Sequence, residues 1–260
     1  MSEDNYYYTI DFGINFASDK YYNNKQIDQI INESYSKGVD KIISISNNYR
    51  ECLRNIELSK KYDMLYFTLG IHPNNARNFR ETDIMFIKNN LKNAKCFGIG
   101  EFGLDYNRMF SAKDIQIIVF KKQLHLAKEC NAKMYLHCRD AHFDFVRILK
   151  EIGYYNGLVH CFSGNTTEAL ELINLGLKLG ITGLLLNKKR NMDLIKVIEN
   201  IDLSNIVIET DGPFFGIYPN KNSHPADTER IVRKIAQIKK INEVDVGKQL
   251  YDNANSLLQK

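Results

Sequence analysis

The sequence predicts an α/β fold, a single closed (β/α)8 barrel in which each parallel strand is followed by a helix. Eight strand-like segments alternate with helix-like segments along the 260-residue chain. Most of the strand-like segments are continuously apolar, which is typical of parallel strands buried on both faces. A doubly wound open sheet is the alternative. No linker rich in proline, glycine or serine divides the chain, so we expect residues 1–260 to form one domain.

The expected strands are short apolar runs bounded by polar or turn-forming residues. In chain order they are Tyr8–Asn15, Lys41–Ser46, Leu65–His72, Cys96–Glu101, Lys133–His137, Gly157–His160, Lys178–Thr182 and Ile206–Asp211. Helices are expected where apolar residues recur at helical spacing. They are Gln26–Ser36, Arg50–Lys61, Thr82–Leu91, Asp114–Cys130, Phe143–Ile152, Thr166–Leu175, Met192–Asn200, Asp227–Lys239 and Val244–Leu258.

Composition and charge exclude several classes of protein. The formal charge of +4 permits an anionic substrate but does not by itself indicate nucleic acid, because 35 basic residues nearly balance 31 acidic ones. The polar, acidic start of the chain resembles neither a signal peptide nor a transit sequence, and no apolar stretch could span a bilayer. Five scattered cysteines without a CxxC pair predict free thiols. We therefore expect a cytoplasmic or nuclear protein without membrane attachment.

Four of the apolar runs end on a side chain that can bind a metal or move a proton. They end at Glu101, His137, His160 and Asp211. Because the carboxyl ends of parallel barrel strands meet at one rim, we expect these four side chains to converge on one pocket. A set of two carboxylates and two imidazoles holds a divalent metal and leaves room for water and substrate. The pattern favours a metal-dependent hydrolase, with Glu101 able to bridge two metals and Asp211 able to accept a proton from water.

Each of these residues has a structural alternative when taken alone. A histidine at a strand end is more often a hydrogen-bonded structural residue than a ligand. A lone carboxylate often caps a helix, and Asp211 precedes Gly212-Pro213, a common turn sequence. Four such residues at four strand ends are harder to explain in this way, so the metal site is the preferred interpretation.

Five segments resemble motifs of the TatD family of metal-dependent deoxyribonucleases, which are amidohydrolase-like barrels. The segments are GIHP (70–73), GIGEFGLDYNR (98–108), YLHCRDAH (135–142), HCFSG (160–164) and IETDGP (208–213). The resemblance extends from Thr9 to the last expected helix. It implies a TIM barrel, dependence on divalent metal and hydrolysis of DNA phosphodiester bonds, often as a 3′-5′ exonuclease. It also implies that Glu101, His137, His160 and Asp211 are metal ligands.

The first strand departs from the pattern of many members of this family. They carry Asp-x-His-x-His there, and both imidazoles ligate the first metal. This chain has Asp11, Gly13 and Asn15 at these positions, like a branch of the family that includes TatD itself. Gly13 has no ligand atom, so Asp11 and Asn15 are candidates for weak ligands or for residues that orient one. Oxygen-rich sites favour Mg²⁺ or Mn²⁺ over Zn²⁺, and one or two ions could bind.

A second departure is the segment KNSHPAD (221–227), where the family tends to have an Arg-Asn-Glu-Pro-x-His run. His224 and Asp227 are displaced from that pattern, and neither is assigned a role.

Further polar residues are expected near the same rim. His72 could contact a phosphate or leaving group, or cap the loop that follows it. Arg108 and Arg139 could clamp a phosphate, or form surface ion pairs. Asp105, expected in the loop after the fourth strand, could orient a metal ligand. The chain also has a basic run at 188–190 that could steer a nucleic-acid backbone.

Aromatic and cysteine residues near the rim have simpler expected roles. Four aromatic residues could stack bases or simply pack: Tyr106, Phe162, Phe214 and Phe215. Cys138 and Cys161 each follow a predicted ligand, so we expect both to point away from the pocket.

Three functions are consistent with this sequence. The first is a metal-dependent phosphodiesterase that acts on DNA, as a single strand or at a 3′ end, with no protein partner evident. The second is an ester or amide hydrolase such as a D-aminoacyl-tRNA deacylase, because related barrels support both chemistries. Glu101 stands where many amidohydrolases have a lysine that can be carbamylated. The third is a nucleic-acid-binding barrel without activity, which the intact set of four ligand residues argues against.

Overall fold

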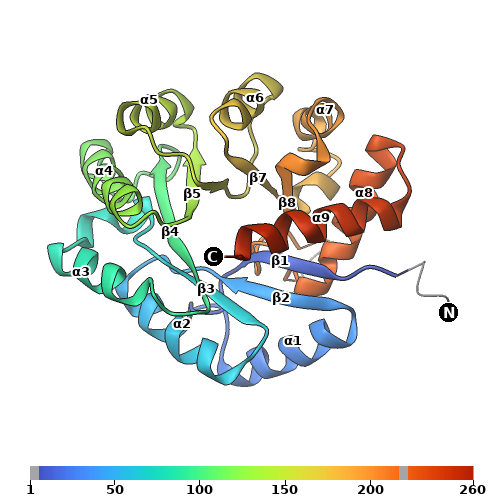
Figure 1. The fold of residues 1–260 in the computed structure, drawn as a ribbon, viewed down its shortest axis with the longest axis horizontal. Coiled ribbons are helices and arrows are strands. Elements are labelled where there is room, and N and C mark those ends of the chain that lie inside the picture. The colour runs from blue at the N-terminus through green and yellow to red at the C-terminus, as the bar shows by residue number, and fades with distance from the viewer. Residues whose placement is uncertain (1–5, 217–221, 260) are drawn as a thin grey trace.

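The computed structural model describes residues 6–216 and 222–259, and its eight strands form one parallel sheet in chain order from β1 to β8. A parallel bridge between Ile14 and Gly212 joins β1 to the segment after β8. Asp211 N donates to Gly13 O and Asn15 N donates to Gly212 O, each over 2.8 Å. The two edges of the sheet therefore meet, and helices surround the strands (Figure 1). The predicted barrel is confirmed, and the open sheet is wrong.

All eight expected strands form, but several end elsewhere than predicted. They are β1 Thr9–Ile14, β2 Val39–Ser44, β3 Leu65–Leu69, β4 Cys96–Asp105, β5 Met134–Arg139, β6 Gly157–Val159, β7 Lys178–Ile181 and β8 Ile206–Ile208. Pairing with β5 continues from Phe102 to Asp105, so Glu101 lies inside β4 instead of at its end. Beyond Ile208, Thr210 N donates to the side chain of Asp11, which interrupts the ladder. Asp211 therefore lies on a loop.

The expected helices form within two residues of their predicted ends. They are α1 Asn24–Ser36, α2 Tyr49–Lys61, α3 Glu81–Asn90, α4 Lys113–Glu129, α5 His142–Ile152, α6 Thr166–Asn174, α7 Met192–Asn200, α8 Thr228–Lys239 and α9 Glu243–Leu258. Asparagine side chains accept backbone hydrogen bonds at the starts of several helices, at Asn23, Asn48 and Asn165. Such caps satisfy donors that the first helical turn leaves free.

The two ends of the barrel differ in chemistry. At the end where the strands begin, Ile10, Phe12 and Val207 pack with Ala254 and Leu257 of α9 in one apolar cluster. Figure 1 shows α9 lying beside β1 across this part of the barrel. Polar groups accordingly gather at the opposite end, where the strands finish. No helix in the described ranges is both long enough and apolar enough to traverse a bilayer.

Candidate metal centre and active site

A cavity of about 660 Å³ opens at the end of the barrel where the strands finish. Glu101, His137, His160 and Asp211 all line it, and so does His72. The structure therefore brings the four predicted ligand residues together in one place. Of the four, only His137 lies near the end of its strand; Glu101 lies inside β4, and His160 and Asp211 lie beyond β6 and β8.

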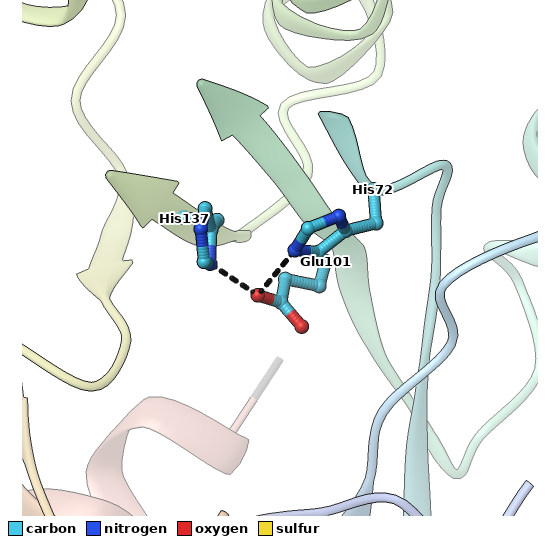
Figure 2. A group of neighbouring side chains, drawn as sticks. All are labelled: His72, Glu101 and His137. Atoms are coloured by element: carbon cyan, nitrogen blue, oxygen red, sulfur yellow. Dashed lines mark hydrogen bonds and ion pairs between the residues drawn. The ribbon is translucent and has the colours of Figure 1, made fainter. Parts of the chain in front are cut away.

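The carboxylate of Glu101 lies at the centre of three imidazoles. Its Oε1 is 2.6 Å from His137 Nδ1 and 3.5 Å from both His72 Nε2 and His160 Nε2. Figure 2 shows His72 and His137 pointing at this same oxygen. Burial opposes ionisation of Glu101, but the surrounding imidazoles, His160 foremost, outweigh it and hold the pKa of the carboxyl below its usual range. Glu101 is therefore an ionised carboxylate.

His137 carries a buried nitrogen without a hydrogen-bond partner among the described residues. Its Nε2 makes no hydrogen bond, and the nearest carboxylate oxygen is Asp105 Oδ2 at 3.4 Å. Burial lowers the pKa of His137, but Asp105 and Glu101 raise it by more. A buried nitrogen that makes no hydrogen bond is costly in the absence of a ligand. This atom, set among nitrogen and oxygen donors, fits a divalent cation.

Two groups of potential metal ligands lie in the cavity. The ligand atoms of His72, Glu101 and His137 lie within 4.8 Å of one another, and so do those of His160, Cys161 and Asp211. The prediction that the two cysteines point away from the cavity is wrong for Cys161, whose Sγ lies within 4.8 Å of ligand atoms of His160 and Asp211, whereas Cys138 packs against the hydrophobic core. Cys161 lies beyond the end of β6 with a left-handed φ of 46°, so the side-chain alternation of a strand does not apply to it.

Glu209 and Tyr135, which the sequence interpretation missed, orient His160. Nδ1 of His160 lies 2.8 Å from the Tyr135 hydroxyl and 3.1 Å from Glu209 Oε1. Tyr135 also donates to Glu209 Oε2 over 2.5 Å. Burial lowers the pKa of His160, but Glu209 and Glu101 raise it to about 10. With Nδ1 engaged, Nε2 is the nitrogen that faces the cavity, an arrangement common among metal-binding histidines.

Gly13 is required where it stands because Tyr135 and Glu209 fill the space beside it. A β-carbon on Gly13 would collide with the Tyr135 hydroxyl and would lie 2.8 Å from Glu209 Oε2. The space beside Gly13 is thus occupied by Glu209, which follows β8, and by Tyr135 of β5.

Asp11 and Asn15 lie close to Asp211 but differ in their surroundings. Asp11 is fully buried and accepts hydrogen bonds from Thr210 N and Oγ1, over 2.8 and 2.6 Å. It is absent from the described residues that line the cavity. Asn15 lines the cavity, donates from Nδ2 to Asp211 Oδ1 over 3.0 Å, and accepts from Asn47 at its amide oxygen. Both side chains therefore position the loop that carries Asp211.

Asp105 is the last residue of β4, so the prediction that it lies in the following loop is wrong. Pairing with Arg139 of β5 extends the strand to this residue. Its Oδ1 accepts from the backbone N of Asn107 and Arg108, over 3.0 and 2.9 Å. Its Oδ2 lies 3.4 Å from His137 Nε2.

His72 takes one of the two roles that the sequence left open, the cap of the loop that follows it. Its Nδ1 accepts from Asn74 N over 2.9 Å and so caps the short 3-10 helix Pro73–Asn78, while Nε2 faces Glu101. Burial lowers the pKa of His72 to about 3, so the imidazole is neutral at physiological pH. His72 lies beyond the end of β3, on the loop, and not in the strand.

Cations and aromatic rings surround the mouth of the cavity. The basic residues that line it are Lys20, Arg77, Arg108, Arg139 and Arg190, and the aromatic ones are Tyr21, Phe110, Phe214 and Phe215. None of the four arginines forms an ion pair within the described part of the chain. Phe162 is buried in the core, and the Tyr106 hydroxyl donates to Asp144 over 3.0 Å.

His224 and Asp227 form a local cap away from this cavity. His224 Nδ1 accepts from Ala226 N, and Asp227 Oδ2 accepts from His224 N. Nε2 of His224 lies 3.2 Å from Glu33 Oε2. Lys221, the first residue of the segment that departs from the family pattern, lies outside the described residues.

A (β/α)8 barrel with imidazoles and carboxylates gathered where its strands finish is the architecture of a metal-dependent hydrolase. Residues 10–259 match the TatD related DNase family, and the chain belongs to that family. The resemblance deduced from the motifs is thus confirmed, and the protein is an enzyme, a hydrolase of the TatD family.

Two curated relatives match nearly the whole chain. The 3′-5′ ssDNA/RNA exonuclease TatD of Pectobacterium parmentieri (strain WPP163) is 30% identical over 259 residues, covering 96% of this chain and 98% of that protein. The uncharacterized metal-dependent hydrolase YabD of Bacillus subtilis (strain 168) is 32% identical over 239 residues, covering 90% and 92%.

Solved structures agree with the barrel. YJJV, a TatD homologue from Escherichia coli k12, superposes with a TM-score of 0.89 at 24% identity, covering 96% of this chain and 97% of that one. A TatD family hydrolase from Entamoeba histolytica superposes with a TM-score of 0.86 at 26% identity, covering 96% and 98%.

Proposed function

We propose that this enzyme hydrolyses phosphodiester bonds of single-stranded DNA from the 3′ end, with Mg²⁺ or Mn²⁺ as its cation. The observation that carries the proposal is the convergence of three imidazoles on Glu101 at the floor of a cavity rimmed by unpaired arginines. A polyanion fits such a rim because phosphate neutralisation dominates the affinity of proteins for nucleic acids. The name of the Pectobacterium relative, an exonuclease acting on single strands, supports the same substrate.

Glu101, His137, His160 and Asp211 would hold one or two cations. A divalent cation there would polarise a phosphoryl oxygen and lower the pKa of a water molecule. We assign to Asp211 the role of the base that accepts the proton of the attacking water. Burial raises the pKa of Asp211 to about 7, and Asn15 Nδ2 donates to its Oδ1, so the carboxylate is oriented and is a suitable base near neutral pH.

Arg108 and Arg139 would stabilise the negative charge that grows on the phosphate oxygens. Both line the cavity, and guanidinium groups form paired hydrogen bonds to phosphate. His72, neutral and in contact with Glu101, would keep that carboxylate in position without adding a positive charge.

The test is cleavage of a labelled single-stranded DNA with and without Mg²⁺ or Mn²⁺. We expect activity with either metal, loss of activity in EDTA, and loss by at least about a hundredfold in folded Asp211→Asn and Glu101→Ala variants. Asp252→Asn, an exposed change on α9, is the matched control and should leave activity unchanged. Undiminished cleavage by both site variants would contradict the proposed site.

The same preparation also tests the competing chemistry. D-aminoacyl-tRNA should remain acylated under conditions in which 3′-labelled DNA loses its terminal nucleotide. Deacylation without nucleotide release would favour the ester hydrolase instead.

A further inference from the structure

A second cavity of about 400 Å³ lies beside the one that holds the metal ligands. Cys138 and Ser163 line both cavities, so the two share a wall. The second one lies between the segments that follow β5 and β6, and its lining includes Asp140, Phe143, Phe162 and Glu168. The second cavity is therefore the immediate neighbour of the first on this side of the barrel.

The two cavities differ in their charged residues: among the described residues of the first, basic side chains stand beside the carboxylates Glu51, Glu101, Asp105 and Asp211. Five lysines and arginines line the first, whereas no lysine or arginine occurs among the described residues that line the second. Its ionisable residues are instead Asp140, Glu168 and His142, and His142 Nε2 lies 3.0 Å from Glu171 Oε2. A phosphate would be repelled from such a cavity, but a neutral group with N–H donors would be attracted.

Both carboxylates have an oxygen left for a ligand. Asp140 Oδ2 accepts from Asn107 and Glu168 Oε2 accepts from Asn165 N, over 2.7 and 3.0 Å. Within the described chain, Asp140 Oδ1 and Glu168 Oε1 accept no hydrogen bond. Carboxylate oxygens of this kind accept hydrogen bonds from the exocyclic amines of nucleobases.

An aromatic side chain stands at the edge of the second cavity with most of its surface in solvent. Phe143, at the start of α5, is 80% exposed. An exposed ring is accessible to a ligand, and base stacking on such rings is common in proteins that bind single strands. The core ring of Phe162 lies on the inner side of the same cavity.

We propose that the second cavity binds the base of a nucleotide next to the scissile phosphodiester and prefers bases that carry an exocyclic amine. The base stacks on Phe143, and its amine donates to Glu168 and Asp140. This inference rests on the proposed nuclease function and adds to it a base preference, with adenine, cytosine or guanine favoured over thymine or uracil.

The experiment compares 5′-labelled single strands that are identical except for one nucleotide. Either the terminal 3′ nucleotide or its neighbour carries adenine, thymine or no base. At one of the two positions, we expect removal of the base to lower kcat/KM of the wild-type enzyme at least about fivefold, mainly through KM. Adenine should be preferred over thymine at that position.

Two variants assign the preference to the cavity. In Phe143→Ala the strands with and without the base should be cleaved with nearly equal kcat/KM, and Phe143→Tyr should restore the difference. Glu168→Gln keeps the capping bond to Asn165 N but offers an amide N–H, so preference should move towards thymine, whose O4 accepts a hydrogen bond. Tyr35→Ala, which removes a ring that is 76% exposed on α1, is the control and should change nothing.

The outcomes separate this inference from the function on which it rests. Equal cleavage of all strands by the wild type would overturn the base cavity and leave the nuclease proposal standing. A base preference that persists unchanged in both Phe143→Ala and Glu168→Gln would also overturn it. Failure to cleave any strand with Mg²⁺ or Mn²⁺ would overturn the nuclease proposal, and this inference with it.

Discussion

Glu209 lies 3.1 Å from His160 Nδ1 and accepts hydrogen bonds from the Tyr135 hydroxyl and from Cys161 N, both over 2.5 Å. It is fully buried, so its charge is balanced by the imidazolium of His160 when no cation is bound. Burying a carboxylate costs free energy unless it is paired and hydrogen-bonded. Glu209 meets both conditions, and in return it determines which nitrogen His160 turns to the cavity.

Glu209→Gln should therefore weaken cation binding without removing a proposed ligand. The amide keeps the shape of the side chain but removes the charge that holds His160 Nδ1. Loss of such a partner typically lowers metal affinity by about 10- to 100-fold. Calorimetric titration with Mn²⁺ measures the effect. Glu199→Gln, an exposed change on α7, should bind Mn²⁺ as the wild type does, and equal affinity in Glu209→Gln would contradict this role.

Cation affinity should rise with pH between about 6 and 9. Burial raises the pKa of Asp211 to about 7, so below this pH its carboxyl is protonated and cannot ligate. His160, with its pKa raised to about 10, must also lose a proton to bind through nitrogen. Protons and metal compete for both side chains, so binding releases protons. Titration in two buffers of different ionisation enthalpy measures this release; affinity independent of pH would contradict the assignment of both ligands.

At the scale of strands and helices, the local sequence pattern was sufficient to predict which strands and helices form. The residues at which strands end depend on pairing with distant segments. Apolar runs and helical periodicity predicted the eight strands and the α-helices of the described residues, but not the short 3-10 helices. The end of β4 depends on β5, and the early end of β8 depends on the carboxylate of Asp11. Neither partner is visible from the run itself. Glu209 was missed for the same reason, because Tyr135 and His160 reach it only after the barrel closes.

Buried hydrogen bonds attach α9 to the start of β8. Asn253, buried on α9, donates from Nδ2 to Leu203 O and Ile206 O, over 2.6 and 2.8 Å. These bonds hold α9 at the start of β8, at the end of the barrel opposite the metal ligands.

Asn253→Ala should lower stability and leave the chemistry unchanged. The change removes both hydrogen bonds while Leu203 O keeps the one from Ile206 N, and leaving a buried group unsatisfied typically costs about 1–3 kcal/mol. Urea unfolding should show this loss of free energy, while kcat of the folded variant stays at the wild-type value. Asn200→Ala is the control. It removes one solvent-exposed hydrogen bond from Asn200 to Lys196 O on α7, so it should lower the free energy of unfolding by less. A fall in kcat of folded Asn253→Ala would contradict this prediction, because it would mean that this end of the barrel affects the chemistry at the other end.

At the scale of the whole molecule, the distribution of charge matters more than its sum. The formal charge is only +4, yet among the residues that the structure describes five basic side chains line one cavity. Arg77 comes from the 3-10 helix after β3 and Arg190 from the basic run before α7, so separate parts of the chain supply this rim. The sequence interpretation named Arg108 and Arg139 from their motifs. It missed Arg77 because only the closed barrel brings that loop to the rim.

Affinity for a single strand should fall as salt rises, and each rim arginine should account for part of that fall. For single strands, log K falls with log salt with a slope whose magnitude is about 0.7 for each phosphate that the protein neutralises. Losing one phosphate contact therefore makes the slope shallower by about 0.7. Fluorescence anisotropy of a labelled strand, measured in an Asp211→Asn background to prevent cleavage, gives this slope. Arg77→Ala and Arg190→Ala should each reduce it by about that amount, whereas Lys248→Ala, exposed on α9 away from the cavity, should leave it unchanged. Equal slopes in all three variants would mean that the strand does not cross this rim.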